Sequence, residues 1–386
     1  MTDVSSGGRE GASDNLSAPT LAVQVDLGQR AYPIEIGTGN LSQIASFLLA
    51  RRKVTHAVVI TDDHVEQPHS HAVCQSLSNA HVRVDQLVLD PGESTKCIEI
   101  ADAVWQKLPE FGTDRKSAIV AVGGGVIGDL AGFIAATYAR GLPFFQVPTT
   151  LLAQVDSSVG GKVGVNLPTV KNMVGAFWQP AGVLIDTEVL ATLPERDYRS
   201  GLAEVVKYGV ILDPAFFEYL EQHVEELRQR DAATLRYVVA RCCRLKADVV
   251  EQDEREETGL RAVLNYGHTF AHAFESLTGY GTLMHGEAVS IGMLCASRLA
   301  ARLGRIDDTL THRQTALLLA LRLPIDVPAL DEQAVLRVMR QDKKVEHGKL
   351  RFVLPSRMGQ VELVGNVDEA DVLAALDSGD DASHSG

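Results

Sequence analysis

The chain has 386 residues, of which 45% are hydrophobic and 22% charged, and at roughly 150 residues per domain it is long enough for about two globular domains. Its 36 Lys and Arg against 50 Asp and Glu give a formal net charge of −14, which argues against nucleic acid as a partner because phosphates are bound by basic side chains. No run approaches the roughly 20 apolar residues of a membrane span, and residues 1–20 lack the apolar core of a signal peptide, so we expect a cytoplasmic protein without a membrane partner.

The first half of the chain has the pattern of an α/β domain. After a Ser-, Gly- and Asp-rich extension over 1–20, expected to be disordered, short β-branched runs alternate with helical patterns up to residue 193. The expected strands are 56–61, 82–89, 117–125, 144–150 and 182–187, and the clearest helix is 131–140. This alternation predicts parallel strands with helices on both faces, a Rossmann-like N-terminal domain over 21–193. Residues 66–73, with His69 and His71, are typical of a surface loop.

Helical patterns dominate from residue 194 to residue 376. Apolar side chains recur at helical spacing over 200–211, 217–229, 233–254, 265–277, 286–304 and 331–341, and the clearest strand is 350–355. This predicts a mostly α-helical C-terminal domain over 194–376, followed by a disordered tail over 377–386. The five cysteines are odd in number and form no CxxC pair, which favours reduced structural thiols, with Cys242 and Cys243 in the core.

A glycine-rich segment over 121–136, AVGGGVIGDLAGFIAA, runs from an expected strand into an expected helix. Free backbone N–H groups at such a helix start, together with the helix dipole, suit a pyrophosphate. The segment lacks the GxGxxG pattern, so a dinucleotide site and a merely tight strand–helix turn both fit it. Asp129 is either a charge in the first helical turn or a ligand contact.

The segment 146–177 combines hydroxyl, amide and cationic side chains. Thr149 and Thr150 follow a strand at its carboxyl end, where open α/β sheets bind their ligands. Beyond them come polar residues pinned by glycines: Asp156, Ser157, Ser158, Lys162, Asn166, Lys171 and Asn172. We interpret the segment as a long loop that holds a polyoxygenated anion, with a solvated loop as the alternative.

Histidines and a glutamate at helical spacing suggest a metal site. Glu204 and Lys207 lie three residues apart, and His285 opens a later helix. A further set, expected on one helix, comprises Arg261, Asn265, His268 and His272. One Glu and two His with an open position suit catalytic zinc, and helix-packing histidines are the alternative. The first His of the HxxxH pair is not followed by Glu, as it is in the HExxH motif of metalloproteases, which argues against a protease. A charged run over 340–352 contains Asp342, Lys343 and Lys344. Its simplest interpretation is a solvent-exposed surface segment.

Taken together, these segments closely resemble the 3-dehydroquinate synthase family, within the superfamily of NAD-dependent sugar-phosphate cyclases. The motifs occur in the family's order and spacing over residues 21–375: GGGVIGDLAGFIAATYARG, QVPTTLLAQVDSSVGGK, KNMVGAFWQP, TLPERDYRSGLAEVVKYG, LNYGHTFAHA, HGEAVSIGM, DKKV and LRFVLP. The resemblance implies that the active site lies in the cleft between the two domains.

The resemblance also implies roles for individual residues. The implied metal ligands are Glu204, His268 and His285. The implied NAD contacts are Asp62, Pro91, Gly92, Glu93, Ser94, Thr95, Lys96, Gly125, Val126, Ile127, Gly128, Asp129, Thr149, Thr150, Lys162, Lys171, Val189, Leu190, Ala191 and Thr192. The implied catalytic and substrate contacts are Arg140, Asp156, Lys162, Asn172, Lys207, Lys246, Arg261, Asn265, His272, His285, Lys343 and Lys344.

The implied reaction converts 3-deoxy-D-arabino-heptulosonate 7-phosphate to 3-dehydroquinate and phosphate, the second step of the shikimate pathway. It comprises transient oxidation by NAD, β-elimination of phosphate, re-reduction, ring opening and intramolecular aldol closure. The implied cofactors are NAD and one divalent metal, zinc or else cobalt, and the implied assembly is a homodimer. The scattered cations assigned to the site would then focus a positive field within an acidic protein.

Other functions remain open beside this one. Another sugar-phosphate cyclase, making an inosose or a valiolone, would share the NAD and metal sites. A metal-dependent polyol dehydrogenase would share the α/β-plus-helical plan but release NADH. A catalytically silent NAD- or metal-binding protein is hard to reconcile with a full set of polar site residues.

Overall fold

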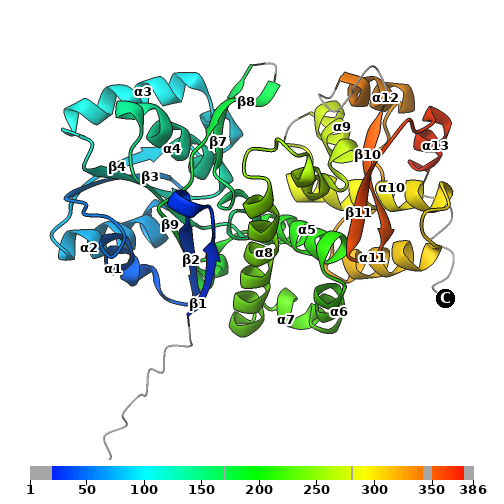
Figure 1. Cartoon of the computed structure of the whole chain (residues 1–386), viewed down its shortest axis with the longest axis horizontal. Coiled ribbons are helices and arrows are strands. Elements are labelled where there is room, and N and C mark those ends of the chain that lie inside the picture. The colour runs from blue at the N-terminus through cyan, green and yellow to red at the C-terminus, as the bar shows by residue number, and fades with distance from the viewer. Residues whose placement is uncertain (1–19, 169, 280, 342–349, 378–386) are drawn as a thin grey trace, which may run out of the picture.

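The computed structural model describes residues 20–168, 170–279, 281–341 and 350–377 (Figure 1). An N-terminal α/β part lies beside a mostly helical C-terminal part, which confirms the predicted fold class. The extension over 1–19, the tail over 378–386 and the predicted site residues Lys343 and Lys344 lie outside the described residues. The domain boundary at residue 193 remains a prediction.

The α/β part is built on one seven-stranded sheet with the strand order β1-β2-β9-β6-β5-β3-β4. Neighbouring strands are parallel except β1, which pairs antiparallel to β2 at one edge. The central strands β5, β6 and β9 are buried along their whole length, which explains their continuous apolar runs. The strands are β1 (Leu21–Val25), β2 (Tyr32–Gly37), β3 (His56–Asp62), β4 (Arg83–Leu89), β5 (Ser117–Gly123), β6 (Phe144–Pro148) and β9 (Gly182–Asp186).

Alternating side chains divide the two faces of the sheet between different helices. Val59 packs with α1 (Ile44–Leu49) and α2 (His71–Asn79), whereas Val58 packs with α3 (Ile98–Glu110) and α4 (Gly125–Thr137). On β9, Leu184 faces the first pair of helices, but Val183 and Ile185 belong to the core of the helical part. The helical part therefore packs directly on the β1-β2-β9 end of the sheet, so the two parts share one core.

The helical part surrounds α10, which is buried along most of its length. Small residues let it approach its neighbours: a Cβ on Gly286 would overlap the carbonyl oxygen of Ser200 on α5, and a Cβ on Gly292 would overlap that of Gly267. The expected helix over 217–229 is instead two helices that break at His223. The elements are α5 (Glu195–Leu212), α6 (Pro214–Gln222), α7 (Val224–Arg228), α8 (Ala232–Gln252), α9 (His268–Thr278), α10 (His285–Arg302), α11 (Asp308–Ala320), α12 (Glu332–Gln341), α13 (Glu369–Ala374), β10 (Arg351–Arg357) and β11 (Gln360–Gly365).

The segment 146–177 is not the long loop that the sequence suggested. After β6 it forms a short helix, η6 (Ala153–Ser157), and then a β-hairpin of β7 (Lys162–Leu167) and β8 (Val170–Phe177). Gly164 and Gly175 face each other across the hairpin, and a Cβ on Gly164 would lie 2.6 Å from the carbonyl oxygen of Val174. The interpretation as a loop was wrong because cross-strand pairing satisfies the backbone of a segment whose glycines and polar residues resemble loop composition.

The segment 66–73 also differs from its expectation as a surface loop. It is a helical turn, Glu66–Ser70, that leads into α2, and His69 is only 6% exposed. The imidazole Nε2 of His69 lies 2.8 Å from the hydroxyl of Thr192. Cys242 and Cys243 are buried and all five cysteines are free thiols, as predicted. Among the described residues, no helix is long and apolar enough to cross a membrane.

Candidate functional site

The predicted cofactor residues lie at one edge of the sheet. Asp62 ends β3, residues 91–96 follow β4, residues 125–129 follow β5, Thr149 and Thr150 follow β6, and residues 189–192 follow β9. These strands are neighbours in the parallel part of the sheet, so their carboxyl ends meet at the same edge. Open α/β sheets bind their ligands at this edge, where the strand order reverses.

The start of α4 presents free backbone amides at this edge. Gly124 is extended and the helix begins at Gly125, so the first-turn N–H groups have no partner within the helix. The loop after β6 packs closely on this turn: a Cβ on Gly124 would lie 3.0 Å from the Thr150 methyl group, and one on Gly125 would lie 3.1 Å from the Ser157 hydroxyl. The turn can therefore accept an anionic group, although the buried Ile127 side chain belongs to the core and offers only its backbone.

The loop over 91–96 is tied to both α4 and the hairpin. Lys96 Nζ lies 3.0 Å from Asp129 Oδ2 and 3.5 Å from Glu93 Oε1. The side-chain amide of Asn166 donates to Glu93 Oε1 at 2.7 Å, and its backbone N–H donates to the Lys96 carbonyl at 2.8 Å. Burial lowers the pKa of Lys96, but the charges of Asp129 and Glu93 outweigh it and raise the pKa above its usual value. Lys96 is therefore a fixed cation at the cofactor edge.

Two further predicted cofactor segments line the same edge. Thr149 is 2% exposed and its hydroxyl has no hydrogen-bond partner among the described residues. In the 189–192 segment, Val189 and Leu190 are core residues, whereas the Thr192 hydroxyl donates to the Val189 carbonyl. The Thr149 hydroxyl is therefore available to a ligand. The side chains of Val189 and Leu190 are not, and their carbonyl oxygens already accept hydrogen bonds from Thr192 and Arg230.

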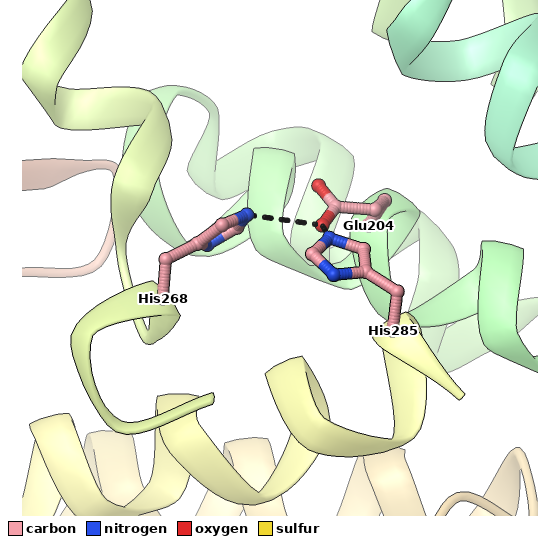
Figure 2. A group of neighbouring side chains, drawn as sticks. All are labelled: Glu204, His268 and His285. Atoms are coloured by element: carbon pink, nitrogen blue, oxygen red, sulfur yellow. Dashed lines mark ion pairs between the residues drawn. The ribbon is translucent and has the colours of Figure 1, made fainter. Parts of the chain in front are cut away.

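Glu204, His268 and His285 converge from three helices, α5, α9 and α10 (Figure 2). Glu204 Oε1 lies 3.6 Å from His268 Nε2 and 3.5 Å from His285 Nε2. One ligand atom from each residue lies within 4.8 Å of the others, which is the spacing of a possible metal site. Spacing of three or four residues along a helix could not bring Glu204 to the histidines. The packing of α5 against α10 does so.

The chemistry of this cluster fits a divalent cation. Glu204 is 1% exposed, and neither of its carboxylate oxygens has a hydrogen-bond partner among the residues that the structure describes, although Lys207 forms an ion pair with it. Burial raises the pKa of Glu204, but Lys207 and the two imidazoles outweigh it and hold the pKa at about 2. Burial and the Lys207 charge keep the pKa of His268 well below its usual value, so this imidazole is neutral. A carboxylate and imidazoles are ligands that zinc and cobalt accept.

Asp156, Lys246 and Tyr208 form a second cluster beside the first, in which Lys246 and Tyr208 are buried and Asp156 is partly exposed. The Lys246 ammonium donates to the carbonyl oxygen of Asp156 at 2.8 Å and to its Oδ1 at 2.7 Å, and the Tyr208 hydroxyl donates to the same Oδ1 at 2.8 Å. Burial acts to raise the pKa of Asp156, but Lys246 and Lys207 outweigh it and hold the pKa far below its usual range. The cluster links η6 of the α/β part to α5 and α8 of the helical part.

The predicted cations Lys162 and Arg261 share one carboxylate. Glu256 forms an ion pair with Lys162, and its Oε1 lies 3.6 Å from Arg261 Nε. Lys162 belongs to the hairpin of the α/β part, whereas Arg261 belongs to the helical part and is 2% exposed. The structure thus brings two cations from different parts of the chain around one anionic group.

The expected single helix with Arg261, Asn265, His268 and His272 is wrong. Arg261 and Asn265 lie on a separate short helix, η8 (Leu260–Asn265), and α9 begins at His268. Between them Gly267 adopts a left-handed backbone with φ of 80°, and a Cβ there would lie 2.7 Å from the backbone nitrogen of Met293. The close approach of the backbone at Gly267 to α10 interrupts the helix and orients His268 toward Glu204.

Several predicted residues do not join these clusters. His272 follows His268 by one turn of α9, with ring centroids 5.7 Å apart. Asn172, on β8, donates its backbone N–H to Asn166 Oδ1 at 2.9 Å. Arg140 lies in the exposed turn after α4 with φ of 66°, and among the described residues it forms no hydrogen bond or ion pair with another predicted site residue.

Sequence reasoning missed three residues that contact the predicted site. Tyr208 binds Asp156, Glu256 pairs with the predicted cations, and Glu275 lies 3.6 Å from His285. Glu275 follows His268 by seven residues on α9, so the helical period could have placed both on one face. The other two contacts join segments far apart in the chain, and no local signal indicates them.

Comparison with known proteins identifies the family. Family models described as the N-terminal and C-terminal parts of 3-dehydroquinate synthase match residues 86–200 and 201–345. A 3-dehydroquinate synthase from Rhodopirellula baltica is 50% identical over 368 residues, covering 94% of this chain and 98% of its own.

Solved structures agree with this relationship at greater distance. A 2-deoxy-scyllo-inosose synthase complexed with carbaglucose-6-phosphate, NAD+ and Co2+ has a TM-score of 0.85 at 27% identity and covers 92% of this chain and 99% of its own. A 2-epi-5-epi-valiolone synthase from Streptomyces hygroscopicus with NAD+ and Zn2+ has a TM-score of 0.82 at 28% identity, covering 89% of this chain and 95% of its own. The chain belongs to the 3-dehydroquinate synthase family.

Proposed function

We propose that this protein converts 3-deoxy-D-arabino-heptulosonate 7-phosphate to 3-dehydroquinate and phosphate, as a carbon–oxygen lyase that depends on NAD and one divalent metal. The observation that carries the proposal is the convergence of Glu204, His268 and His285 next to a set of fixed cations, in a chain 50% identical to a 3-dehydroquinate synthase over most of its length. A direct contact joins the helical part to the α/β part beside this site, since Lys246 of α8 donates to Asp156 of η6.

Glu204, His268 and His285 would hold the metal, with zinc or cobalt as the ion. A cation there supplies Lewis acidity that lowers the pKa of a substrate hydroxyl. Residues 125–129, Lys96 and Thr149 would hold NAD at the carboxyl edge of the sheet. NAD bound there would supply a reversible hydride acceptor. The remaining steps rest on the side chains of the chain itself.

Asp156, Lys246 and Lys207 would orient the substrate and hold its charge. Asp156 stays ionised because Lys246 and Lys207 keep its pKa low, so it accepts hydrogen bonds from substrate hydroxyls. Lys207 is 1% exposed and pairs with Glu204, so its ammonium stays fixed beside the metal ligands. Fixed dipoles and charges of this kind stabilise developing negative charge without reorganising during the reaction.

Lys162 and Arg261 would clamp an anionic group of the substrate. In the structure they flank the Glu256 carboxylate, which stands where a phosphate or carboxylate oxygen of the substrate would be held. Their positive charge would stabilise the leaving phosphate during β-elimination. The other predicted substrate contacts remain predictions: Asn172, Asn265, His272, Arg140, Lys343 and Lys344. The homodimer is also a prediction, which analytical ultracentrifugation can check.

The second candidate is another sugar-phosphate cyclase, because the inosose and valiolone synthases share the whole fold. The sequence identity favours the first candidate: 50% with a 3-dehydroquinate synthase against 27% and 28% with those two enzymes. A polyol dehydrogenase is the weaker alternative, since it would accumulate NADH.

One assay separates these functions. The purified protein with NAD and Zn2+ is given heptulosonate phosphate or glucose 6-phosphate, and phosphate release, product identity and absorbance of NADH are followed. We expect phosphate and 3-dehydroquinate from the first substrate with no net NADH. Phosphate release from glucose 6-phosphate alone would favour an inosose-forming cyclase, and net NADH would favour a dehydrogenase.

A further inference from the structure

We propose that Glu275 is a positioning residue that holds the imidazole of His285 in the orientation that binds the metal. The inference rests on the proposed metal site and deepens it, because it names a residue outside the three ligands on which the affinity for the cation depends. Glu275 lies on α9 and its side chain is 11% exposed.

The imidazole of His285 lies between two carboxylates. Its Nε2 is 3.5 Å from Glu204 Oε1, and its Nδ1 is 3.6 Å from Glu275 Oε2. One ring nitrogen thus faces the proposed metal ligands while the other faces Glu275. In metal sites the nitrogen of histidine that does not bind the ion is commonly held by a carboxylate or carbonyl, which fixes the ring and its tautomer.

His268 has the same arrangement with a different partner. Its Nδ1 lies 3.1 Å from the carbonyl oxygen of Tyr266, which can only accept, so Nδ1 carries the proton and Nε2 is left for the metal. The ring is also fixed by burial, since 12% of the His268 side chain is exposed. In both imidazoles, Nδ1 faces a protein oxygen and Nε2 faces Glu204.

His285 has the greater need of such support. It is the first residue of α10, and 34% of its side chain is exposed, so less surrounding structure restrains the ring. Glu275 comes from the neighbouring helix α9, which also carries His268, so one helix supplies a ligand and the restraint on another ligand. The charge of Lys171 on β8 also acts on the Glu275 carboxylate.

The test measures the binding of Zn2+ alone to metal-free protein, by competition with a chromophoric chelator, for wild type, Glu275→Ala and Glu275→Gln. We expect the dissociation constant for Zn2+ to rise about 10- to 100-fold in Glu275→Ala and less in Glu275→Gln, which keeps the shape and an acceptor oxygen. The absorption spectrum of bound Co2+ should shift in Glu275→Ala, because the ligand field depends on the orientation of His285.

The matched control is Asp213→Asn. The Asp213 side chain is also 11% exposed and lies in the helical part, but it pairs with Arg241 and caps α6. This variant should lose stability in urea while keeping the wild-type affinity for Zn2+. If Glu275→Ala does not fold, Glu275→Gln carries the same comparison.

The proposal is overturned if the folded Glu275 variants bind Zn2+ within about threefold of wild type, far from the 10- to 100-fold loss expected of a lost restraint. An equal loss of affinity in Asp213→Asn would also overturn it, since general destabilisation would then explain the effect. Neither result depends on substrate: failure of the wild type to release phosphate would refute the proposed function and leave the zinc measurements intact.

Discussion

Replacing Tyr208 by Phe removes one hydroxyl from the cluster that joins the two parts of the chain. Tyr208 is 0% exposed, and its hydroxyl donates to Asp156 Oδ1 at 2.8 Å. Burial and the Asp156 charge keep the pKa of Tyr208 well above its usual value, so the hydroxyl remains a donor at every assay pH. Phe keeps the ring and its packing, so the substitution isolates this one hydrogen bond.

The expected cost follows from the charge and exposure of the acceptor. A hydrogen bond to a charged group contributes about 1.5–3 kcal/mol to stability, against about 0.5–1.5 kcal/mol for a neutral pair. The Asp156 side chain is 28% exposed and keeps its bond to Lys246, so water and Lys246 compensate in part. We therefore expect a loss near the lower limit, about 1.5–2 kcal/mol in the free energy of unfolding.

Tyr198→Phe is the matched control. Tyr198 lies on the same helix, α5, and is 1% exposed, but its hydroxyl donates to a neutral acceptor, the Leu227 carbonyl, at 2.6 Å. Its loss should cost about 1 kcal/mol in urea-induced unfolding and leave kcat and KM unchanged. Tyr208→Phe should in addition lower kcat/KM, because Asp156 loses one of the two donors that orient it.

The kinetics decide whether the hydroxyl acts through Asp156. The assay compares urea unfolding and phosphate release for both variants, alone and combined with Lys246→Met. Tyr208 and Lys246 share one oxygen, so their effects should not add. Equal stability losses in the two Tyr→Phe variants with unchanged kinetics, or additive effects with Lys246→Met, would refute the reasoning.

Three further outcomes follow from the structure. Gly286→Ala should destabilise the protein by more than the ~1–3 kcal/mol of ordinary overpacking, because its Cβ would overlap the Ser200 carbonyl. It should also weaken Zn2+ binding, because the overlap would displace the adjacent His285. Urea unfolding and zinc titration measure the two effects, and wild-type values for both would contradict the prediction. Burial holds the pKa of His69 below the value of about 6.5 that it has in the unfolded chain, so the stability contributed by the neutral imidazole is complete above about pH 6.5 and is lost as the pH falls. The difference in unfolding free energy between wild type and His69→Gln should therefore shrink below about pH 6.5. A constant difference in urea unfolding between about pH 5 and pH 8 would contradict this. Glu256→Gln should lower the KM for the substrate because Lys162 and Arg261 lose a competing anion, and a raised KM in steady-state kinetics would instead indicate that Glu256 helps to bind it.

The strand pattern predicted most of the sheet but not its outer edge. The runs that became β3, β5, β6 and β9 are short, apolar and β-branched, which is the signature of strands buried on both faces. The edge strand β4 is only partly buried, and its apolar residues alternate with polar ones in its first half. The first two strands, β1 and β2, were not predicted, although they carry the contact between the sheet and α8. The hairpin β7–β8 was mistaken for a loop because glycines and polar residues weaken its alternating pattern.

The sequence by itself determined which residue types are available for the chemistry, and on which local elements they stand. The period of a helix places Glu204 beside Lys207 and His268 beside His272, and the ends of apolar runs place the threonines and glycines at strand ends. These are local relations between residues a few positions apart, so a linear pattern can show them.

Only the tertiary structure decided how these elements meet. The left-handed Gly267, required by its close contact with α10, separates Arg261 from the helix of His268 and sends the two residues to different clusters. Packing of α5, α9 and α10 brings Glu204 to both imidazoles and Glu275 behind one of them, and η6 brings Asp156 to Tyr208 and Lys246. Such contacts depend on the volumes of side chains and the crossing of helices far apart in the chain, and no local spacing encodes them.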